Sequence, residues 1–211
     1  MEGPLRAGSD DPGLRLIETV LWDGAGCPRI EGHLARLAAG ARALGWPCDA
    51  QAARAALVVP LDRPARLRLT LDRLGRIEVT CAPLPQSRPE WRLALAGTRL
   101  RSDDPWLRLK TTRRGHYDAA RAALPEGIEE AVFLNERGEV CDGTITTVFF
   151  DRGRGLCTPP LSCGLLPGVL RAGMLAAGAC REDVLTAEDL PHVRLWVGNA
   201  LRGLIPAVWM G

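Results

Sequence analysis

The only lysine of this 211-residue chain is Lys110, in the stretch "WLRLKTTRRGHYD" that runs from Trp106 to Asp118. All other members of its 27 lysines and arginines are arginines. An arginine stays protonated in a protein, whereas a lysine amine can lose its proton and add to a carbonyl group as a Schiff base. A composition biased toward arginine can leave one lysine by chance, but any amine chemistry must use Lys110.

Three further segments contain residue types that suit an anionic or aromatic ligand. "HLARL" carries Arg36, and "LLPGVLR" has a Pro-Gly pair before a predicted helix, whose first N–H groups can hold a phosphate. "GEVCDGTITTVFF" places Asp142 between two strand-like stretches. Each segment also has an ordinary interpretation. Arg36 lies off the apolar stripe, where solvated residues are usual, Pro-Gly commonly starts a helix, and Asp142-Gly143 is a common turn dipeptide.

Composition and spacing argue against several other classes of protein. The three histidines, His33, His116 and His192, and the seven cysteines show no metal-ligand spacing and no CxxC motif, so we expect no metal site. The net charge is +2 and the basic residues are dispersed, so we expect no nucleic-acid partner. The N-terminal "MEGPLRAGSDDPG" has no apolar core and no stretch of about 18 apolar residues follows, which predicts a cytoplasmic protein with reduced thiols.

The hydrophobic pattern of the first half predicts the order strand, helix, helix, strand, strand. The expected elements are a strand over 14–24, a helix over 29–46, a helix over 49–57 with Asp49 as N-cap, and a hairpin of "ARLRLTLD" and "IEVTCA". In the first strand of this hairpin, arginines alternate with leucines, so Arg68 is expected to face solvent, although it could also reach a substrate carboxylate.

The second half follows a stretch with three prolines at 83–90, which is the expected linker. It is expected to contain strands in "WRLALA", "WLRLK", "EEAVFLN", "EVCDGT" and "TTVFFD", helices in "HYDAARAAL" and "LLPGVLRAGMLAAG", and two closing strands in "RLWVGNALRGLIPAVWM". The prediction is an α+β fold with two α/β lobes. Residues 1–85 form the smaller lobe, and residues 86–211 form the larger lobe, which carries Lys110.

In this order and at these separations, the four segments resemble the class IV aminotransferase family, the fold-type-IV enzymes that use pyridoxal 5'-phosphate (PLP). The resemblance extends over about residues 14–210. It implies a D-amino-acid aminotransferase-like fold with the cofactor between two lobes, a small amino substrate and a homodimer. The family usually has one more strand before the one expected at 14–24, where residues 1–13 of this chain look irregular.

The resemblance also implies roles for individual residues. Lys110 matches the lysine that binds the cofactor covalently, and Arg36 matches the arginine that binds the cofactor phosphate. Val169 and Leu170 match a helix N-terminus whose backbone amides hold the same phosphate, and Asn199, in "GNAL", matches a polar phosphate contact. The family often has threonine where this chain has Leu170, so here only the amide would serve.

Two more residues would contact the pyridine ring itself. Asp142 falls where the family usually carries a glutamate that pairs with the ring nitrogen. A carboxylate there favours the protonated nitrogen, and a protonated ring accepts electrons better. Tyr117, the only tyrosine, could hydrogen-bond the 3'-oxygen of the ring, as a tyrosine just after the lysine does in some members.

The closing segments favour one branch of the family. "GNALRGLIPA" resembles the 4-amino-4-deoxychorismate lyases more than the Gly-Thr-Ala type of the aminotransferases, and "LKTTRRGHYDAAR" resembles the lysine segment of short lyase-like members. We therefore expect a lyase that gives 4-aminobenzoate and pyruvate in folate biosynthesis. Two alternatives stay open: an aminotransferase for branched-chain or D-amino acids, and a PLP-binding protein without turnover.

Overall fold

The computed structural model describes residues 5–211 and divides into two compact units. Unit 1 consists of Met1–Gln86 and Leu109–Arg113, and unit 2 consists of Ser87–Arg108 and Arg114–Gly211. Both units contain helices and sheet, which confirms the predicted α+β class. The lobes expected at 1–85 and 86–211 remain a prediction; the units differ from them at Gln86 and at Leu109–Arg113, which both belong to unit 1.

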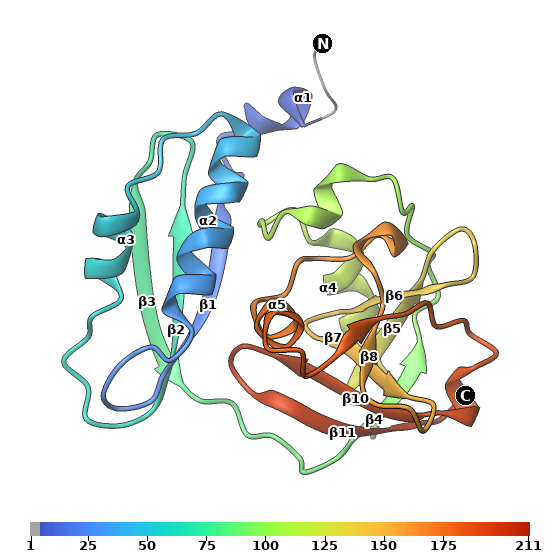
Figure 1. Ribbon diagram of the computed structural model, residues 1–211. Helices are drawn as coiled ribbons and strands as arrows, with labels where there is room; N and C mark the ends of the chain where they lie inside the picture. Colours follow the sequence, from blue (N-terminus) through green and yellow to red (C-terminus); the bar gives the residue numbers. More distant parts are fainter. Residues whose placement is uncertain (1–4) are drawn as a thin grey trace. The chain divides into compact units, whose positions relative to one another are not determined.

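Unit 1 is a three-stranded antiparallel sheet with helices on one face (Figure 1). Its elements are α1 (Arg6–Ser9), β1 (Leu16–Trp22), α2 (Ile30–Leu44), α3 (Ala50–Ala56), β2 (Ala65–Leu71) and β3 (Ile77–Pro83). Along the chain, β1, α2, α3, β2 and β3 follow one another, so the order predicted for the first half from residue 14 onward is confirmed. The sheet order is β1-β2-β3. The side chain of Asp49 accepts hydrogen bonds from the backbone of Gln51 and Ala52 at 2.9 and 3.0 Å, which confirms the predicted N-cap.

The apolar face of β2 is the core of unit 1. Leu67, Leu69 and Leu71 have no exposed surface, whereas Arg66 and Arg68 between them are exposed. This alternation is the period of two that a strand with one covered face requires. Arg68 therefore lies on the solvent face, as the sequence predicts.

The segment with Lys110 runs along the free side of β1. The backbone N–H of Ile17 donates to the carbonyl of Lys110 at 2.8 Å, and the N–H of Thr112 donates to the carbonyl of Arg15 at 2.9 Å. Thr111 forms an antiparallel bridge with Leu16. These backbone bonds explain why the lysine segment belongs to unit 1, although the residues on both sides of it belong to unit 2.

The strand expected at 106–110 is wrong. Pro105–Arg108 forms a 3-10 helix, η1. Asp104 accepts hydrogen bonds from the backbone of Trp106 through its side chain, at 2.9 Å, and of Leu107 through its carbonyl, at 3.2 Å. An aspartate followed by proline favours such a turn, and in this case it outweighs the alternation of Leu107 and Leu109.

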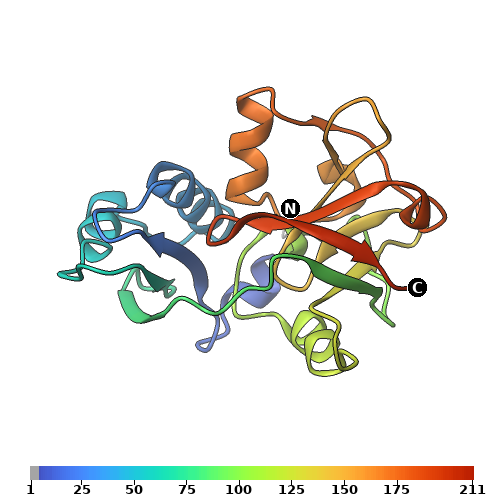
Figure 2. The same cartoon turned by 90° about the horizontal axis from the view of Figure 1, so that it is seen from below.

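Unit 2 contains one eight-stranded mixed sheet of order β6-β5-β4-β11-β10-β7-β8-β9. Its strands are β4 (Trp91–Leu95), β5 (Glu130–Leu134), β6 (Val140–Gly143), β7 (Thr147–Asp151), β8 (Cys157–Thr158), β9 (Arg181–Glu182), β10 (Arg194–Asn199) and β11 (Gly203–Trp209). Its helices are η1, α4 (Gly115–Ala122), η2 (Leu161–Cys163), α5 (Val169–Ala176) and η3 (Leu190–His192). Figure 2 shows the closing hairpin β10–β11 beside β4.

The short connection from β6 to β7 forces this sheet to curl. Only Thr144–Thr146 lie between the two strands, and such a connection spans at most about 15 Å. In a flat sheet, the five steps from β6 to β7 would separate them by about 24 Å. The sheet therefore bends until β6 and β7 approach each other, and the N–H of Gly143 donates to the carbonyl of Thr146 at 2.7 Å.

Candidate active site

Arg36 is held by a buried carboxylate in unit 1. Its Nε donates to Oε1 of Glu18 at 2.8 Å and its Nη2 donates to Oε2 at 2.6 Å, a bidentate pair. The side chain of Arg36 is 13% exposed and that of Glu18 is 3% exposed. The interpretation of Arg36 as a solvated helix residue is therefore wrong, because β1 places Glu18 beneath this part of α2.

His33 completes this cluster from the preceding turn of α2. Its Nδ1 lies 2.6 Å from Oε2 of Glu18, and because a carboxylate can only accept, Nδ1 is the donor. Burial by itself would raise the pKa of Glu18, but the charge of Arg36 and the hydrogen bonds from Arg36 and His33 outweigh it, so this pKa lies below its usual range. The carboxylate thus stays ionised and fixes the guanidinium.

Lys110 and Arg36, the two residues of unit 1 assigned to the cofactor, are hydrogen-bonded to neighbouring residues of β1. Ile17 binds the backbone of Lys110, and Glu18, the next residue, binds the side chain of Arg36. The side chains of successive strand residues point to opposite faces, but their backbone atoms are only about 3.3 Å apart along the strand. The hydrogen bonds of Ile17 and Glu18 therefore lie close together. Within unit 1, β1 therefore positions both residues.

Asp142 lies inside β6, and its interpretation as a turn residue is wrong. It is 6% exposed, and its Oδ2 accepts the backbone N–H of Leu166 at 3.2 Å. Tyr117, on α4, is close enough for the two groups to interact: burial and then the negative charge of Asp142 raise the pKa of the Tyr117 hydroxyl, which therefore stays protonated and able to donate. The ring of Tyr117 is held edge-to-face against Phe133, with centroids 5.3 Å apart.

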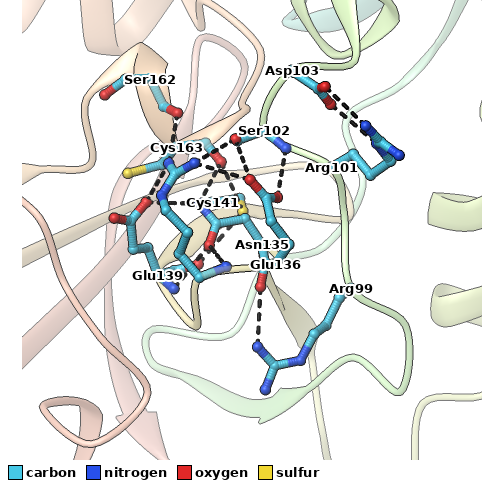
Figure 3. A network of polar contacts seen from close by, with 11 residues as sticks. Arg99, Arg101, Ser102, Asp103, Asn135, Glu136, Glu139, Cys141, Ser162 and Cys163 are labelled. Atoms are coloured by element: carbon cyan, nitrogen blue, oxygen red, sulfur yellow. Dashed lines mark hydrogen bonds and ion pairs between the residues drawn. The ribbon is translucent and has the colours of Figure 1, made fainter.

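A polar network holds the segment that leads to Leu166 (Figure 3). Asn135 is fully buried, and its Nδ2 donates to the carbonyl of Cys163 at 3.1 Å and to Glu139 at 2.7 Å. Arg137 donates to the carbonyl of Ser162 at 3.0 Å and to Glu139 at 2.6 Å. The turn between β5 and β6 is thereby tied to residues 162–163, three residues before the amide that contacts Asp142.

The first turn of α5 suits an anion. Gly168 is its N-cap, no side chain caps the helix, and its first turn holds no acidic residue. Val169 and Leu170 are both 7% exposed, and Leu170 packs with Phe149. A Cβ on Gly168 would lie 2.8 Å from Oγ1 of Thr147, so glycine lets this helix start close to β7. N–H groups and the helix dipole both favour a bound anion here.

Asn199 closes the turn between β10 and β11. Its Oδ1 accepts the backbone N–H groups of Leu201 and Arg202 at 3.1 and 3.0 Å, and its Nδ2 donates to the carbonyl of Ile145 at 3.1 Å. Ile145 belongs to the β6–β7 connection, directly after Asp142 and Gly143. Unit 2 therefore brings Tyr117 and Asp142 together and connects the loop after Asp142 to Asn199.

Comparison with known proteins identifies the family of this chain. Residues 15–208 match the family model described as amino-transferase class IV. The chain belongs to the class IV aminotransferase family. Members of this family depend on PLP, so the protein is a PLP-dependent enzyme, either a lyase or an aminotransferase.

The relatives of this class IV protein carry both kinds of name. A candidate aminodeoxychorismate lyase of Schizosaccharomyces pombe is 29% identical over 176 residues, which cover 80% of this chain and 76% of that protein. The crystal structure of a candidate amino-acid aminotransferase from Mesorhizobium loti is 43% identical, with a TM-score of 0.86, and covers 93% of this chain and 100% of that one. A hypothetical aminotransferase from Mycobacterium tuberculosis in its PLP-bound form is 24% identical, with a TM-score of 0.78 and coverage of 93% and 81%.

The residues present fit PLP. The uncapped start of α5 suits the phosphate, the buried carboxylate of Asp142 suits a protonated ring nitrogen, and Lys110 is the amine that the covalent link requires. Glu18 holds the Nε and Nη2 atoms of the Arg36 guanidinium, so Arg36 is fixed in place. Among the residues that the structure describes, no group of histidine, cysteine and acidic side chains could hold a metal ion.

Sequence reasoning missed Glu18 and His33, which hold Arg36, and Glu130, a fully buried glutamate at the start of β5. His33 and Arg36 are three residues apart on one helix, a spacing that places both on the same face and could have indicated a shared partner. Glu18 and Glu130 are charged residues at strand positions where an apolar residue is usual, and only their pairing in three dimensions explains them.

Proposed function

We propose that this protein is a PLP-dependent 4-amino-4-deoxychorismate lyase that releases 4-aminobenzoate and pyruvate. The observation that carries the choice is the turn at Asn199. Its amide uses both its oxygen and its nitrogen, toward the turn and toward Ile145, and a threonine hydroxyl has only one oxygen for these contacts. An asparagine at this position is the feature in which "GNAL" resembles the lyases, and the curated relative from S. pombe supports the same activity.

Lys110 is proposed as the proton carrier of the reaction. Bound PLP supplies an electron sink for the carbon that loses a proton. The amine of Lys110 takes the proton from C4 of the substrate ring and later gives a proton to the departing enolpyruvyl group. The ring becomes aromatic as the C–O bond to that group breaks, so pyruvate leaves without a second amino acceptor.

Asp142 and Tyr117 are proposed to hold the cofactor ring in its reactive form. Asp142 pairs with the protonated ring nitrogen, and Leu166 fixes the carboxylate through its amide. Tyr117 donates from its hydroxyl, which the raised pKa keeps protonated. Val169, Leu170, Asn199 and Arg36 are proposed to bind the phosphate, so that the ring stays in place while the proton moves.

An aminotransferase for branched-chain or D-amino acids is the second candidate. The observation that favours it is the 43% identity with the candidate amino-acid aminotransferase from M. loti over nearly the whole chain. It would use the same PLP ligands, so the residues named above do not separate the two reactions.

The deciding experiment measures products. The purified, PLP-saturated protein is incubated with 4-amino-4-deoxychorismate, and 4-aminobenzoate is followed by fluorescence and pyruvate by a coupled assay. Parallel samples contain branched-chain or D-amino acids with 2-oxoglutarate, and glutamate is measured. Lys110→Arg is the control for both. Equal amounts of 4-aminobenzoate and pyruvate support the lyase, whereas glutamate without 4-aminobenzoate refutes it and supports the aminotransferase.

We further propose a homodimer that acts in the cytoplasm as part of folate biosynthesis. All seven cysteines lie in the part of the chain that the structure describes and form no disulfide there, as expected in a reducing compartment. None of the helices in residues 5–211 is long and apolar enough to cross a membrane. Sedimentation equilibrium at micromolar concentration tests the dimer, and a fully active monomer would contradict it.

A further inference from the structure

The carboxylate of Glu130 is the most deeply buried charged group of unit 2. Glu130 begins β5 and has no exposed surface. Its Oε1 accepts the N–H of Ala131 at 3.1 Å, the N–H of Thr144 at 3.0 Å and the hydroxyl of Thr144, and its Oε2 accepts the N–H of Ile145 at 3.2 Å and the hydroxyl of Thr146 at 2.8 Å. Five hydrogen bonds thus converge on one side chain, four of them from Thr144–Thr146.

Neutral donors compensate for most of the burial of this charge. The guanidinium of Arg121 also lies near it, with Nη1 3.5 Å from Oε1, but the side chain of Arg121 is 39% exposed. A carboxylate loses its hydrogen bonds with water when it is buried, and donors of the protein have to replace them. The loop Thr144–Thr146 therefore has to keep one conformation for Glu130 to remain in place, and Glu130 in turn fixes the loop.

The backbone approaches this carboxylate closely. A Cβ on Gly143 would lie 2.6 Å from Oγ1 of Thr146 and 2.9 Å from Oε2 of Glu130, so no other residue fits between them without a shift. Gly143 directly follows Asp142. The end of β6 is thus in close contact with the loop Thr144–Thr146. A displacement of this loop would therefore also move Asp142.

The same loop reaches the two other cofactor-binding segments of unit 2. The carbonyl of Ile145 accepts the Nδ2 of Asn199 at 3.1 Å. Thr147, the residue after the loop, lies against Gly168, the N-cap of α5. Asp142, Asn199 and the start of α5 come from distant parts of the sequence. The loop that Glu130 fixes contacts the first two segments, and Thr147, directly after the loop, contacts the third.

We propose that Glu130 is a positioning residue for the cofactor: it fixes Thr144–Thr146 and thereby sets the places of Asp142, Asn199 and the α5 N-terminus for PLP. The proposal rests on the assignment of these residues to PLP in the proposed function. It does not depend on whether the reaction is that of a lyase or of an aminotransferase. Glu130 does not touch the reacting atoms and acts through the loop.

A purely structural role would have a different signature. If Glu130 only stabilised the curled sheet, its loss would lower the melting temperature of the protein without PLP, and the molecules that remain folded would bind PLP normally. A positioning role requires that the folded molecules themselves bind PLP more weakly and hold it in another geometry.

The test compares Glu130→Gln with Glu129→Gln. The glutamine side chain keeps the shape but replaces one acceptor oxygen by an NH₂ group, so at least one backbone N–H that now donates to Glu130 would face a donor. Glu129 is a matched control. It is the adjacent glutamate, and its carboxylate binds the N–H of Arg92 at 2.8 Å and pairs with Arg88 at 3.1 Å, away from the β6–β7 loop. For each protein, the melting temperature without PLP, the dissociation constant of PLP and the visible circular dichroism of bound PLP at saturation are measured.

We expect Glu130→Gln to raise the PLP dissociation constant at least tenfold and to alter the visible circular dichroism at saturation. Glu129→Gln should stay within twofold with an unaltered spectrum. A Glu130→Gln protein that melts earlier but binds PLP within twofold of the wild type, with an unaltered spectrum, would overturn the proposal. A wild-type protein that has neither lyase nor aminotransferase activity would refute the proposed function but leave the PLP result standing.

Thr146 provides the same test if Glu130→Gln does not fold. Thr146→Val keeps the volume and removes one hydroxyl donor to Glu130, whereas Thr146→Ser keeps the hydroxyl. We expect the valine variant to bind PLP at least threefold more weakly than the serine variant. Equal affinities of the two variants would overturn the proposal.

Discussion

Glu18 of unit 1 and Glu130 of unit 2 are both glutamates on strands with almost no exposed surface, but they are compensated in different ways. Glu18 binds the guanidinium of Arg36 and the ring of His33, so it holds side chains. Glu130 binds mainly backbone N–H groups and hydroxyls of one loop, so it holds backbone. A buried acid can therefore place a single cation or shape a whole segment, and the identity of its donors decides which.

The difference extends to the rest of the candidate site. In unit 1, Lys110 and Arg36 are held by two consecutive residues of β1. In unit 2, Asp142, Asn199 and the start of α5 contact the loop Thr144–Thr146 or Thr147, the residue directly after it. We therefore expect single side-chain changes in unit 1 to act locally, whereas changes around the loop of unit 2 act on several ligands together.

The largest effect should come from Lys110→Arg. This variant keeps the charge and leaves the backbone bonds to β1 intact, but it removes the only amine that can bind PLP covalently. We expect no visible absorption band that borohydride can abolish, and activity at the background of the assay. If the variant still shows this band, the assignment of Lys110 is wrong, because no other lysine exists.

The next effect concerns Asp142→Asn in unit 2. The change keeps the shape and removes the charge that would hold the ring nitrogen protonated. We expect the turnover number of the PLP-saturated variant to fall by about 10²–10⁴. PLP content should stay near that of the wild type, because the phosphate ligands remain. Turnover within threefold of the wild type at full PLP content would show that Asp142 does not serve the ring.

A smaller effect is expected for Arg36→Ala in unit 1. The loss of charge-assisted hydrogen bonds should weaken PLP binding at least tenfold. The variant also leaves Glu18 without its cation, which costs stability of about 3–5 kcal/mol when a buried pair is broken. Arg36→Lys separates the loss of PLP binding from the loss of stability. It keeps the positive charge beside Glu18 and loses only the bidentate hydrogen bonding of the guanidinium. PLP affinity equal to that of the wild type in both variants would remove Arg36 from the phosphate site.

The smallest effect should appear in the stability of Glu139→Gln at different pH values. The hydrogen bond from Arg137 lowers the pKa of Glu139 to about 2 from the ordinary value of 4.5, despite an opposing effect of burial. The carboxylate therefore stabilises the fold above pH 4.5, and this contribution is lost as the pH falls toward 2. Because Arg137 is 45% exposed, we expect less than about 1 kcal/mol.

Urea unfolding of wild type and Glu139→Gln at pH 7 and pH 3 checks this expectation. The difference in unfolding free energy between the two proteins should be smaller at pH 3. A difference that grows at low pH would mean that the pKa of Glu139 is raised in the folded protein. For Glu18, whose pKa is also lowered, the sign is the same, and its buried partner should make the dependence steeper.

Most of the helices and strands could be predicted from the sequence, because each depends on residues that are close together in the chain. The alternation in β2 and the cap at Asp49 need only neighbouring residues, and both predictions are confirmed. The strand expected at 106–110 is wrong because the Asp104-Pro105 turn outweighs the alternation of Leu107 and Leu109. The family resemblance, and not periodicity, selected Arg36, since a helix pattern alone assigns it to solvent.

Residues whose role depends on a distant partner could not be found in this way. Glu130 is separated by 14 residues from the first donor of the loop that it binds, and Asn199 by 54 residues from Ile145. A carboxylate in a strand gives no sign in the sequence of which donors will meet it. The same holds for Glu18, which looks like a polar interruption of an apolar strand until α2 covers it.

The order of strands in the sheet of unit 2 has a consequence for synthesis. β11 is the last strand along the chain among those that the structure describes, yet it lies in the interior of the sheet, between β4 and β10. Ala207 of β11 pairs with Trp91 of β4, more than a hundred residues earlier in the chain. This parallel pairing therefore cannot form until β11 has left the ribosome. Until then, the edge of β4 that will pair with β11 stays open, and an open strand edge can pair with other chains.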